Sequence, residues 1–293
     1  MPWKEYSLKF INGTLLRVFG VTVQRIKPQK RHCFDPGGIL YEHRLRDIVL
    51  EFPLRRWRTT NQAIETGEPN ILSKAVQLAA RESDRDRRLL AVRSAFETYG
   101  RSSSFPNAAR RMGLSDDEAP GMKGAPPWAV HYPWDTVDVD RRIRMINEVA
   151  LEENLKLGAR LDAYNGGALI AGRPMSREKM EIEVTRTVQL MESIEAKGYI
   201  LPEICADPVR ATILKDGDGA WRWMVRGGVH RVSVAHGLGL KAIPCTVVRV
   251  VYRCDVGCWP GVKKGVFTKR GALKVFDLTF HGKRHDAGMG RHV

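Results

Sequence analysis

The strongest constraint on the fold is a run of short apolar segments, separated by glycine turns, between residues 208 and 252. Residues 208–215 and 221–225 alternate as strands, and the Asp-Gly pairs between them are typical of a hairpin turn. Two glycines then open a helix within residues 226–240, and residues 241–252 form a final apolar strand. The pattern predicts an α+β fold with a small mixed sheet in this part of the chain.

The turn at residues 226–231, with the sequence RGGVHR, carries the chemistry of an anion site. Glycine lets the backbone approach a ligand closely, and the first N–H groups of a helix point out of its positive end. His230 and Arg231 add an imidazole and a guanidinium group, which suit a di- or triphosphate. The alternative is a tight structural turn in which Arg231 pairs with a nearby carboxylate and His230 is an ordinary surface residue.

Helices are predicted before this unit and after it. Residues 138–157 are amphipathic, and a longer helix begins after Ser176 and stops at Gly198. The aromatic segment 128–134 reads as a strand. Near the C-terminus, Thr268 is a predicted cap for a further helix.

A series of residues in one order carries a family resemblance. It comprises Leu190, Ser193-Ile194, Gly198, the hairpin, the glycine turn with His230 and Arg231, Gly239 and Ile243-Pro244. The series resembles the ParB/sulfiredoxin fold and covers residues 175–250, less than a third of the chain. The fold expected from the resemblance is a helix, a strand pair, a phosphate-binding turn, a second helix and a terminal strand.

The resemblance implies that the chain binds ATP or CTP, together with Mg²⁺. Residue by residue, it implies that Gly227, Gly228, His230 and Arg231 bind the phosphates. Val229 stands where sulfiredoxins have their reactive cysteine, so reduction of a sulfinic acid is not expected. His230 stands where ParB proteins have the first of two arginines, which is a departure from the pattern of chromosome-partition proteins. The activities that remain compatible with the resemblance are phosphoryl transfer and nucleotide hydrolysis.

Phosphoryl transfer depends on charge neutralisation and positioning, commonly with a magnesium ion held by a carboxylate. The candidate carboxylates are Glu181 and Glu183 in the predicted long helix, and Asp135 after the aromatic segment. Among these, Glu183 and Asp135 are the catalytic candidates. Lys179 and Arg186 lie on the same predicted helix and are further candidates for the site. The simpler alternative for each is a place on a solvated helix face.

The N-terminal part of the chain reads as mainly helical. Residues 41–58 form one predicted helix, and residues 70–100 form two helices joined by a turn. Residues 102–117 favour a helical hairpin over a DNA-reading helix-turn-helix, because turn-forming residues follow them. The predicted regions are a basic helical N-terminal region (1–125), a ParB/sulfiredoxin-like domain (126–250) and a basic C-terminal extension (251–293).

The charge is unevenly distributed. The net charge is +15, of which residues 1–125 contribute +8 and residues 249–293 contribute +7, while the middle is neutral. Basic flanks attract polyanions, so a non-enzymatic nucleic-acid-binding protein is an alternative function. A membrane-surface protein of a polysaccharide pathway is another, suggested by the apolar and basic first 30 residues. Because no apolar segment approaches the ~20 residues that span a bilayer, we expect a cytoplasmic protein or one at the inner membrane face.

The cysteines give no metal site. They are Cys33, Cys205, Cys245, Cys254 and Cys258, an odd number that lacks the two close pairs of a structural zinc site. We therefore expect reduced thiols, and the only metal implied is the Mg²⁺ that accompanies a nucleotide.

Overall fold

The computed structural model describes residues 29–32, 48–58, 70–102, 105–168, 175–200, 208–217 and 219–282. Within these residues the strands are β1 (Gln29–His32), β2 (Ile48–Pro53), β3 (Trp57–Arg58), β4 (Arg210–Lys215), β5 (Trp221–Gly227) and β6 (Ala242–Tyr252). The α-helices are α3 (Ile71–Ala79), α4 (Arg85–Ser102), α5 (Ala108–Arg111), α6 (Val139–Leu155), α7 (Arg177–Lys197), α8 (Val229–Gly237), α9 (Pro260–Lys263) and α10 (Lys269–His281). Short 3-10 turns are η2 (Leu54–Arg56), η3 (Pro120–Met122) and η4 (Arg253–Cys258).

The strands form one mixed sheet in the order β1-β2-β6-β4-β5-β3. The predicted hairpin is present as the antiparallel pair β4 and β5, with Thr212 opposite Met224. Strand β6 runs parallel to β4 and antiparallel to β2. Parallel neighbours need a crossover connection, and α8 lies on the chain between β5 and β6 to supply it. The predicted α+β class is therefore confirmed.

The structure confirms the predicted ends of α7 and the predicted start of α10. The Ser176 hydroxyl accepts a hydrogen bond from the Lys179 N–H at the start of α7, and Gly198, with φ of +71°, ends that helix. The Thr268 hydroxyl accepts from the Gly271 N–H at the start of α10. These caps satisfy backbone groups that a helix terminus leaves unpaired, so local sequence is sufficient to place them.

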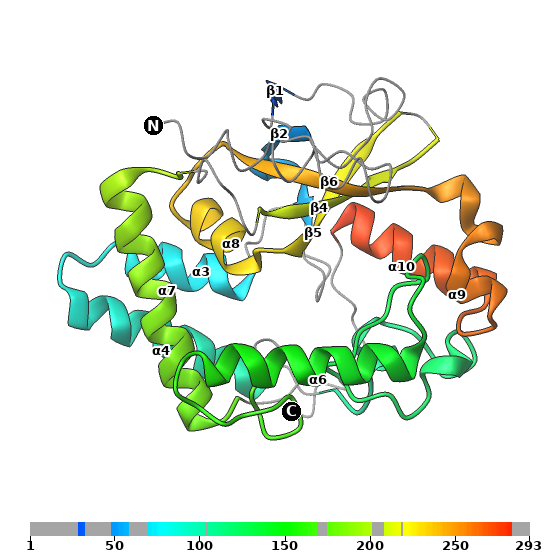
Figure 1. Ribbon diagram of the computed structural model, residues 1–293, viewed down its shortest axis with the longest axis horizontal. Helices are drawn as coiled ribbons and strands as arrows, with labels where there is room; N and C mark the ends of the chain where they lie inside the picture. Colours follow the sequence, from blue (N-terminus) through cyan, green and yellow to red (C-terminus); the bar gives the residue numbers. More distant parts are fainter. Residues whose placement is uncertain are drawn as a thin grey trace, which may run out of the picture.

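Helices cover both faces of the sheet (Figure 1). On one face, Trp223 and Val225 of β5 lie in a hydrophobic cluster with Val232 and Ala235 of α8, which we call the sheet cluster. Beyond α8, its Val234 joins side chains of α3, α4 and α7 in a second cluster. Helix α8 is therefore buried between the sheet and these three helices.

The other face of the sheet packs against α10, and α9 lies next to α10 beyond the end of β6 (Figure 1). Met224 of β5 points to this side and joins Trp134, Trp259, Phe276 and Phe280, among others, in what we call the α10 cluster. Trp134 meets the rings of Trp259 and Phe276 edge-on, with ring centroids 5.2 and 6.0 Å apart. The alternation of β5 residues between the two clusters follows from the two-residue period of a strand.

Three sequence predictions are wrong at the level of elements. Residues 48–58 form β2, η2 and β3 rather than a helix, because β2 pairs with the distant strand β6. Residues 128–134 are buried but form no strand, since Pro126, Pro127 and Pro133 lack the N–H groups that a sheet requires. The expected helical hairpin at 102–117 is present only as the single turn α5, capped by Asn107.

The three predicted regions contribute side chains to a common hydrophobic core. The α10 cluster takes side chains from residues 108–125, 130–134 and 251–280, and strands β1 to β3 belong to the same sheet as β4 to β6. The division at residues 125 and 250 stays a prediction. Residues 1–28, on which the membrane-surface alternative rests, and residues 283–293 lie outside the described part of the chain.

Candidate functional site

The predicted strand–glycine–helix turn is present, with β5 ending at Gly227 and α8 beginning at Val229. Gly228 is the residue before the helix. Its φ of +84° lies in the left-handed region, which residues other than glycine rarely adopt. A Cβ at this position would lie 2.9 Å from Val209 Cγ2 and 3.1 Å from Arg231 Nη2. A Cβ at Gly227 would lie 2.9 Å from Arg210 Nε. Two guanidinium groups therefore lie directly against the turn.

A buried ionic cluster holds His230, the second residue of α8. Its Nε2 lies 2.5 Å from Glu183 Oε2, and the other oxygen of Glu183 lies 2.5 Å from Lys179 Nζ. Lys179 and Glu183 are one helical turn apart on α7, so both project from the same face toward α8. Lys179 Nζ also donates to Asn154 Oδ1 of α6, at 2.7 Å. Glu183 and Lys179 are 0% and 2% exposed, so the cluster belongs to the interior.

Glu183 is ionised in this cluster. Burial alone would raise the pKa of its carboxyl group, but the charges and hydrogen bonds of His230 and Lys179 outweigh burial and lower the pKa to about 2. The carboxylate therefore orients the imidazole of His230. Arg186, whose Nη1 lies 4.0 Å from Glu183 Oε1, is at the edge of the same cluster.

Asp135 forms a second cluster at the end of β5. Its Oδ1 accepts a hydrogen bond from Arg226 Nη2 at 2.9 Å and lies 3.5 Å from Arg249 Nη1 of β6. Its Oδ2 accepts from the Tyr132 N–H at 3.3 Å, and the residue is 5% exposed. Arg226 immediately precedes Gly227, so one ionic cluster lies before the glycine turn and the other after it.

The structure brings most of the predicted site residues together, in two groups. Glu183, Lys179, His230 and Arg186 form one cluster, with Gly227, Gly228 and Arg231 at the turn beside it. Asp135 lies in the other cluster. Sequence reasoning missed Asn154, Arg210 and Arg249. Asn154 had a signal, because it lies four residues after Ala150 on the buried face of a predicted amphipathic helix.

Neither Glu183 nor Asp135 is arranged to hold a magnesium ion. The oxygens of Glu183 contact Lys179 and His230, and those of Asp135 contact two arginines and a backbone N–H. Across the described ranges, no group of three or more His, Cys, Asp or Glu side chains could hold a metal. The residues present therefore do not fit a magnesium ion held by these two carboxylates.

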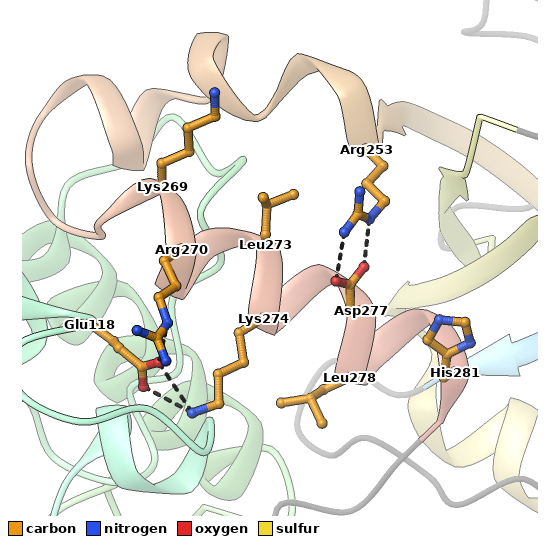
Figure 2. Close-up of a pocket in the computed structure, with 9 residues that line it drawn as sticks. All are labelled: Glu118, Arg253, Lys269, Arg270, Leu273, Lys274, Asp277, Leu278 and His281. Carbon is orange, nitrogen blue, oxygen red and sulfur yellow. Dashed lines mark hydrogen bonds and ion pairs between the residues drawn. The ribbon is translucent and has the colours of Figure 1, made fainter.

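A separate groove of about 720 Å³ lies along α10 (Figure 2). It is lined by Glu118, Arg253, Lys269, Arg270, Leu273, Lys274, Asp277, Leu278 and His281. Asp277 accepts two hydrogen bonds from Arg253, at 2.7 and 2.8 Å, and Glu118 Oε2 accepts from Lys274 at 2.9 Å. Lys269 stands apart from both pairs in Figure 2. The groove therefore has more cations than carboxylates.

Comparisons of the chain with known proteins identify no relative. No protein-family model, no curated protein and no solved structure matches this chain. Within the described residues, none of the helices combines the length and the apolar character needed to cross a membrane. Function therefore has to be argued from the geometry of the site.

Proposed function

We propose that this chain binds the polyphosphate group of a nucleoside triphosphate, ATP or CTP, at residues 227–231. The observation that carries the proposal is the left-handed Gly228 at the junction of β5 and α8. This conformation opens α8 without a Cβ in front of its first N–H groups, which are the positive end of the helix dipole. The guanidinium groups of Arg210 and Arg231 lie within 3.1 Å of the Cβ positions that the two glycines leave empty.

The buried cluster behind the turn supports the proposal. Because Glu183 is ionised and contacts His230 Nε2, it fixes the ring at the start of α8 before a ligand arrives. A pre-ordered imidazole beside two guanidinium groups loses little freedom on binding an anion. The element order α7, β4, β5, turn, α8, β6 is also the order expected from the ParB/sulfiredoxin resemblance. That fold assignment is part of the proposal.

Phosphoryl transfer or hydrolysis is the finer part of the proposal. Glu183 and Asp135 are its catalytic candidates from the sequence, but each is already paired with cations inside the protein. A carboxylate with a pKa of about 2 is a weak proton acceptor at neutral pH. We therefore assign Glu183 a positioning function through His230 and expect catalysis, where it occurs, to rest on cations that neutralise the phosphates.

Thermal unfolding with ATP, CTP and GTP, each with and without MgCl₂, tests the proposal. A ligand specific to the native state stabilises it by about 2.7 kcal/mol at 100 times its Kd. We expect one of the first two nucleotides to raise Tm, and we expect Arg231→Ala to abolish the rise. Arg270→Ala is the matched control, because Arg270 is 91% exposed and lies on α10. A nucleotide shift that survives Arg231→Ala, or no shift for any nucleotide, contradicts the proposal.

The α10 groove favours a second candidate function, nucleic-acid binding. Lys269, Arg270 and Lys274 are exposed along one helix and come from the basic C-terminal flank. If a nucleic acid is the ligand, its affinity falls steeply with salt, because bound phosphates release counter-ions. The double variant Lys269→Ala/Arg270→Ala then weakens binding of a fluorescent DNA duplex, and Arg231→Ala leaves it unchanged.

A further inference from the structure

The cluster around Asp135 contains more positive charge than its one carboxylate balances. Arg226 lies 2.9 Å from Asp135 Oδ1 and Arg249 lies 3.5 Å from it. Arg249 Nη1 also donates to the Trp134 carbonyl oxygen. The side chain of Asp135 is 6% exposed, and those of the two arginines are 21% and 36% exposed. Two cations are thus drawn partly out of water around one anion.

Helix α6 adds a third guanidinium group. Arg142 Nε donates to the Val130 carbonyl oxygen at 3.3 Å. Burial lowers the pKa of Arg142, and the charge of Arg226 lowers it further, so these two guanidinium groups repel each other. With Asp135, the three arginines leave a net charge of +2. Lys264, which donates to the Thr136 carbonyl oxygen at 3.2 Å, adds to the positive field at this cluster.

A buried donor in the cluster is left without an acceptor. Arg226 Nη1 is buried, and no described residue accepts a hydrogen bond from it. Unpaired buried donors are costly, and a guanidinium group is among the costliest to leave unpaired. An oxyanion removes both problems, because it supplies acceptors and negative charge together.

The cluster lies on the opposite side of the sheet from α8. Alternate residues of a strand point to opposite faces, and Met224 of β5 belongs to the α10 cluster. Arg226, two positions further on, contacts Asp135 beside Trp134 of that same cluster. His230 instead contacts α7 on the α8 side. An anion at Arg226 is therefore distinct from one at the glycine turn.

We propose that Arg142, Arg226 and Arg249 form a second anion site that binds a phosphate or carboxylate group. Asp135 fixes two of the guanidinium groups, since Oδ1 faces both arginines and Oδ2 accepts from the Tyr132 N–H. The planar fork of a guanidinium group matches the oxygens of either anion. The site does not depend on nucleotide binding at residues 227–231.

Thermal unfolding at constant ionic strength, with chloride exchanged for inorganic phosphate or for malonate, tests this site. We expect at least one of the two anions to raise the Tm of the wild-type protein. Arg142→Met removes that rise and weakens the anion affinity about tenfold or more, as expected for hydrogen bonds to a charged group. In chloride alone, Arg142→Met loses the hydrogen bond to the Val130 carbonyl and also the repulsion with Arg226, so we compare each anion response with the same variant in chloride. Arg249→Met on β6 is the second variant, with the same expected loss.

Two controls separate this site from its surroundings. Arg141→Met changes the neighbouring, exposed arginine of α6 and keeps the full anion response. Arg231→Ala keeps the response too, while it abolishes any nucleotide response, so failure of one site is distinguishable from failure of the other. The proposal is overturned if neither anion raises Tm beyond chloride, or if Arg142→Met and Arg249→Met respond as the wild type does.

Discussion

Glu183 shows how one residue can decide the chemistry of a buried site. It is 0% exposed, yet it is charged, and its two oxygens tie Lys179 of its own helix to His230 of α8. An isolated carboxylate in the interior would take up a proton. Here, the interactions with His230 and Lys179 outweigh burial, lower the pKa of the carboxyl group and keep it ionised. The orientation of His230 therefore depends on the charge of Glu183.

Glu183→Gln should destabilise the protein by about 3 kcal/mol or more at pH 7, because it leaves Lys179 buried without its anion. The folded-state pKa of Glu183, about 2, lies below its ordinary value of 4.5. Its contribution is therefore fully present above pH 4.5 and is lost as the pH falls toward 2. Urea unfolding of both proteins at pH 7, 4 and 3 should show a difference that shrinks with acidity.

Glu181→Gln is the matched control for that experiment. Glu181 lies on the same helix, two residues earlier, and its Oε2 is 2.5 Å from Arg93 Nη2 at a half-exposed position. Exposed ion pairs contribute about 0–1 kcal/mol. Equal losses in the two variants, or a Glu183→Gln loss that does not shrink at low pH, would show that Glu183 is not an ionised anchor.

At the scale of elements, two properties of Gly228 shape the turn between β5 and α8. Its backbone is in the left-handed region, and the side chains of Val209 and Arg231 lie close to the position that a Cβ would take. Gly228 and Gly239 flank α8 and have nearly the same φ, +84° and +80°. They differ in surroundings, because a Cβ at Gly239 meets nothing within 4 Å, whereas one at Gly228 meets Val209 and Arg231. The pair therefore separates backbone strain from steric contact.

Gly239→Ala should cost about 1 kcal/mol, the strain of placing a side chain in the left-handed region. Gly228→Ala carries the same strain and in addition pushes Val209 and Arg231 away, so its loss of stability should be larger. It should also abolish the nucleotide-induced rise in Tm, which Gly239→Ala should retain. Denaturant unfolding and nucleotide titration of the two variants check both expectations. A smaller loss for Gly228→Ala would contradict the steric argument.

Elements with local signals could be predicted from the sequence, and those fixed by distant partners could not. The caps Ser176 and Thr268 and the hairpin before β5 are encoded within a few residues, and each is present. Strand β2 is different, because its partner β6 lies almost 200 residues away and nothing near Pro53 indicates it. The local sequence of this segment therefore favoured a helix, but pairing with β6 makes it a strand.

The same distinction holds for the site. The glycine turn with His230 and Arg231 is a continuous motif, so its position and conformation could be predicted. The contact between His230 and Glu183 was within reach, since both were candidates for one site. The contacts of Lys179 with Asn154 and of Asp135 with Arg249 join separate elements, and no spacing in the sequence predicts them. The sequence suggested Lys179 and Asp135 by their charge, but only tertiary packing reveals their partners Asn154 and Arg249.

At the scale of the whole molecule, the sheet links two cores. The sheet cluster and the α10 cluster lie on its two faces, and β5 contributes alternate side chains to both. Residues of α10, predicted as part of a separate C-terminal extension, thus share a core with Trp134 and Met224. We therefore expect that loss of packing on one face of the sheet also lowers the stability of the other face, because β5 belongs to both clusters.

Phe276→Ala tests this coupling, because Phe276 is fully buried against Trp134, Trp259 and Phe280. Truncation of a buried phenylalanine costs about 3–5 kcal/mol. If the two faces unfold together, amide hydrogen exchange that proceeds through global unfolding should accelerate in α7 and α8 as well as in α10. Acceleration confined to residues 251–282 would instead support an independently folding extension. Since β4, β5 and β6 contribute to both clusters, we expect one cooperative transition, with tryptophan fluorescence and circular dichroism moving together.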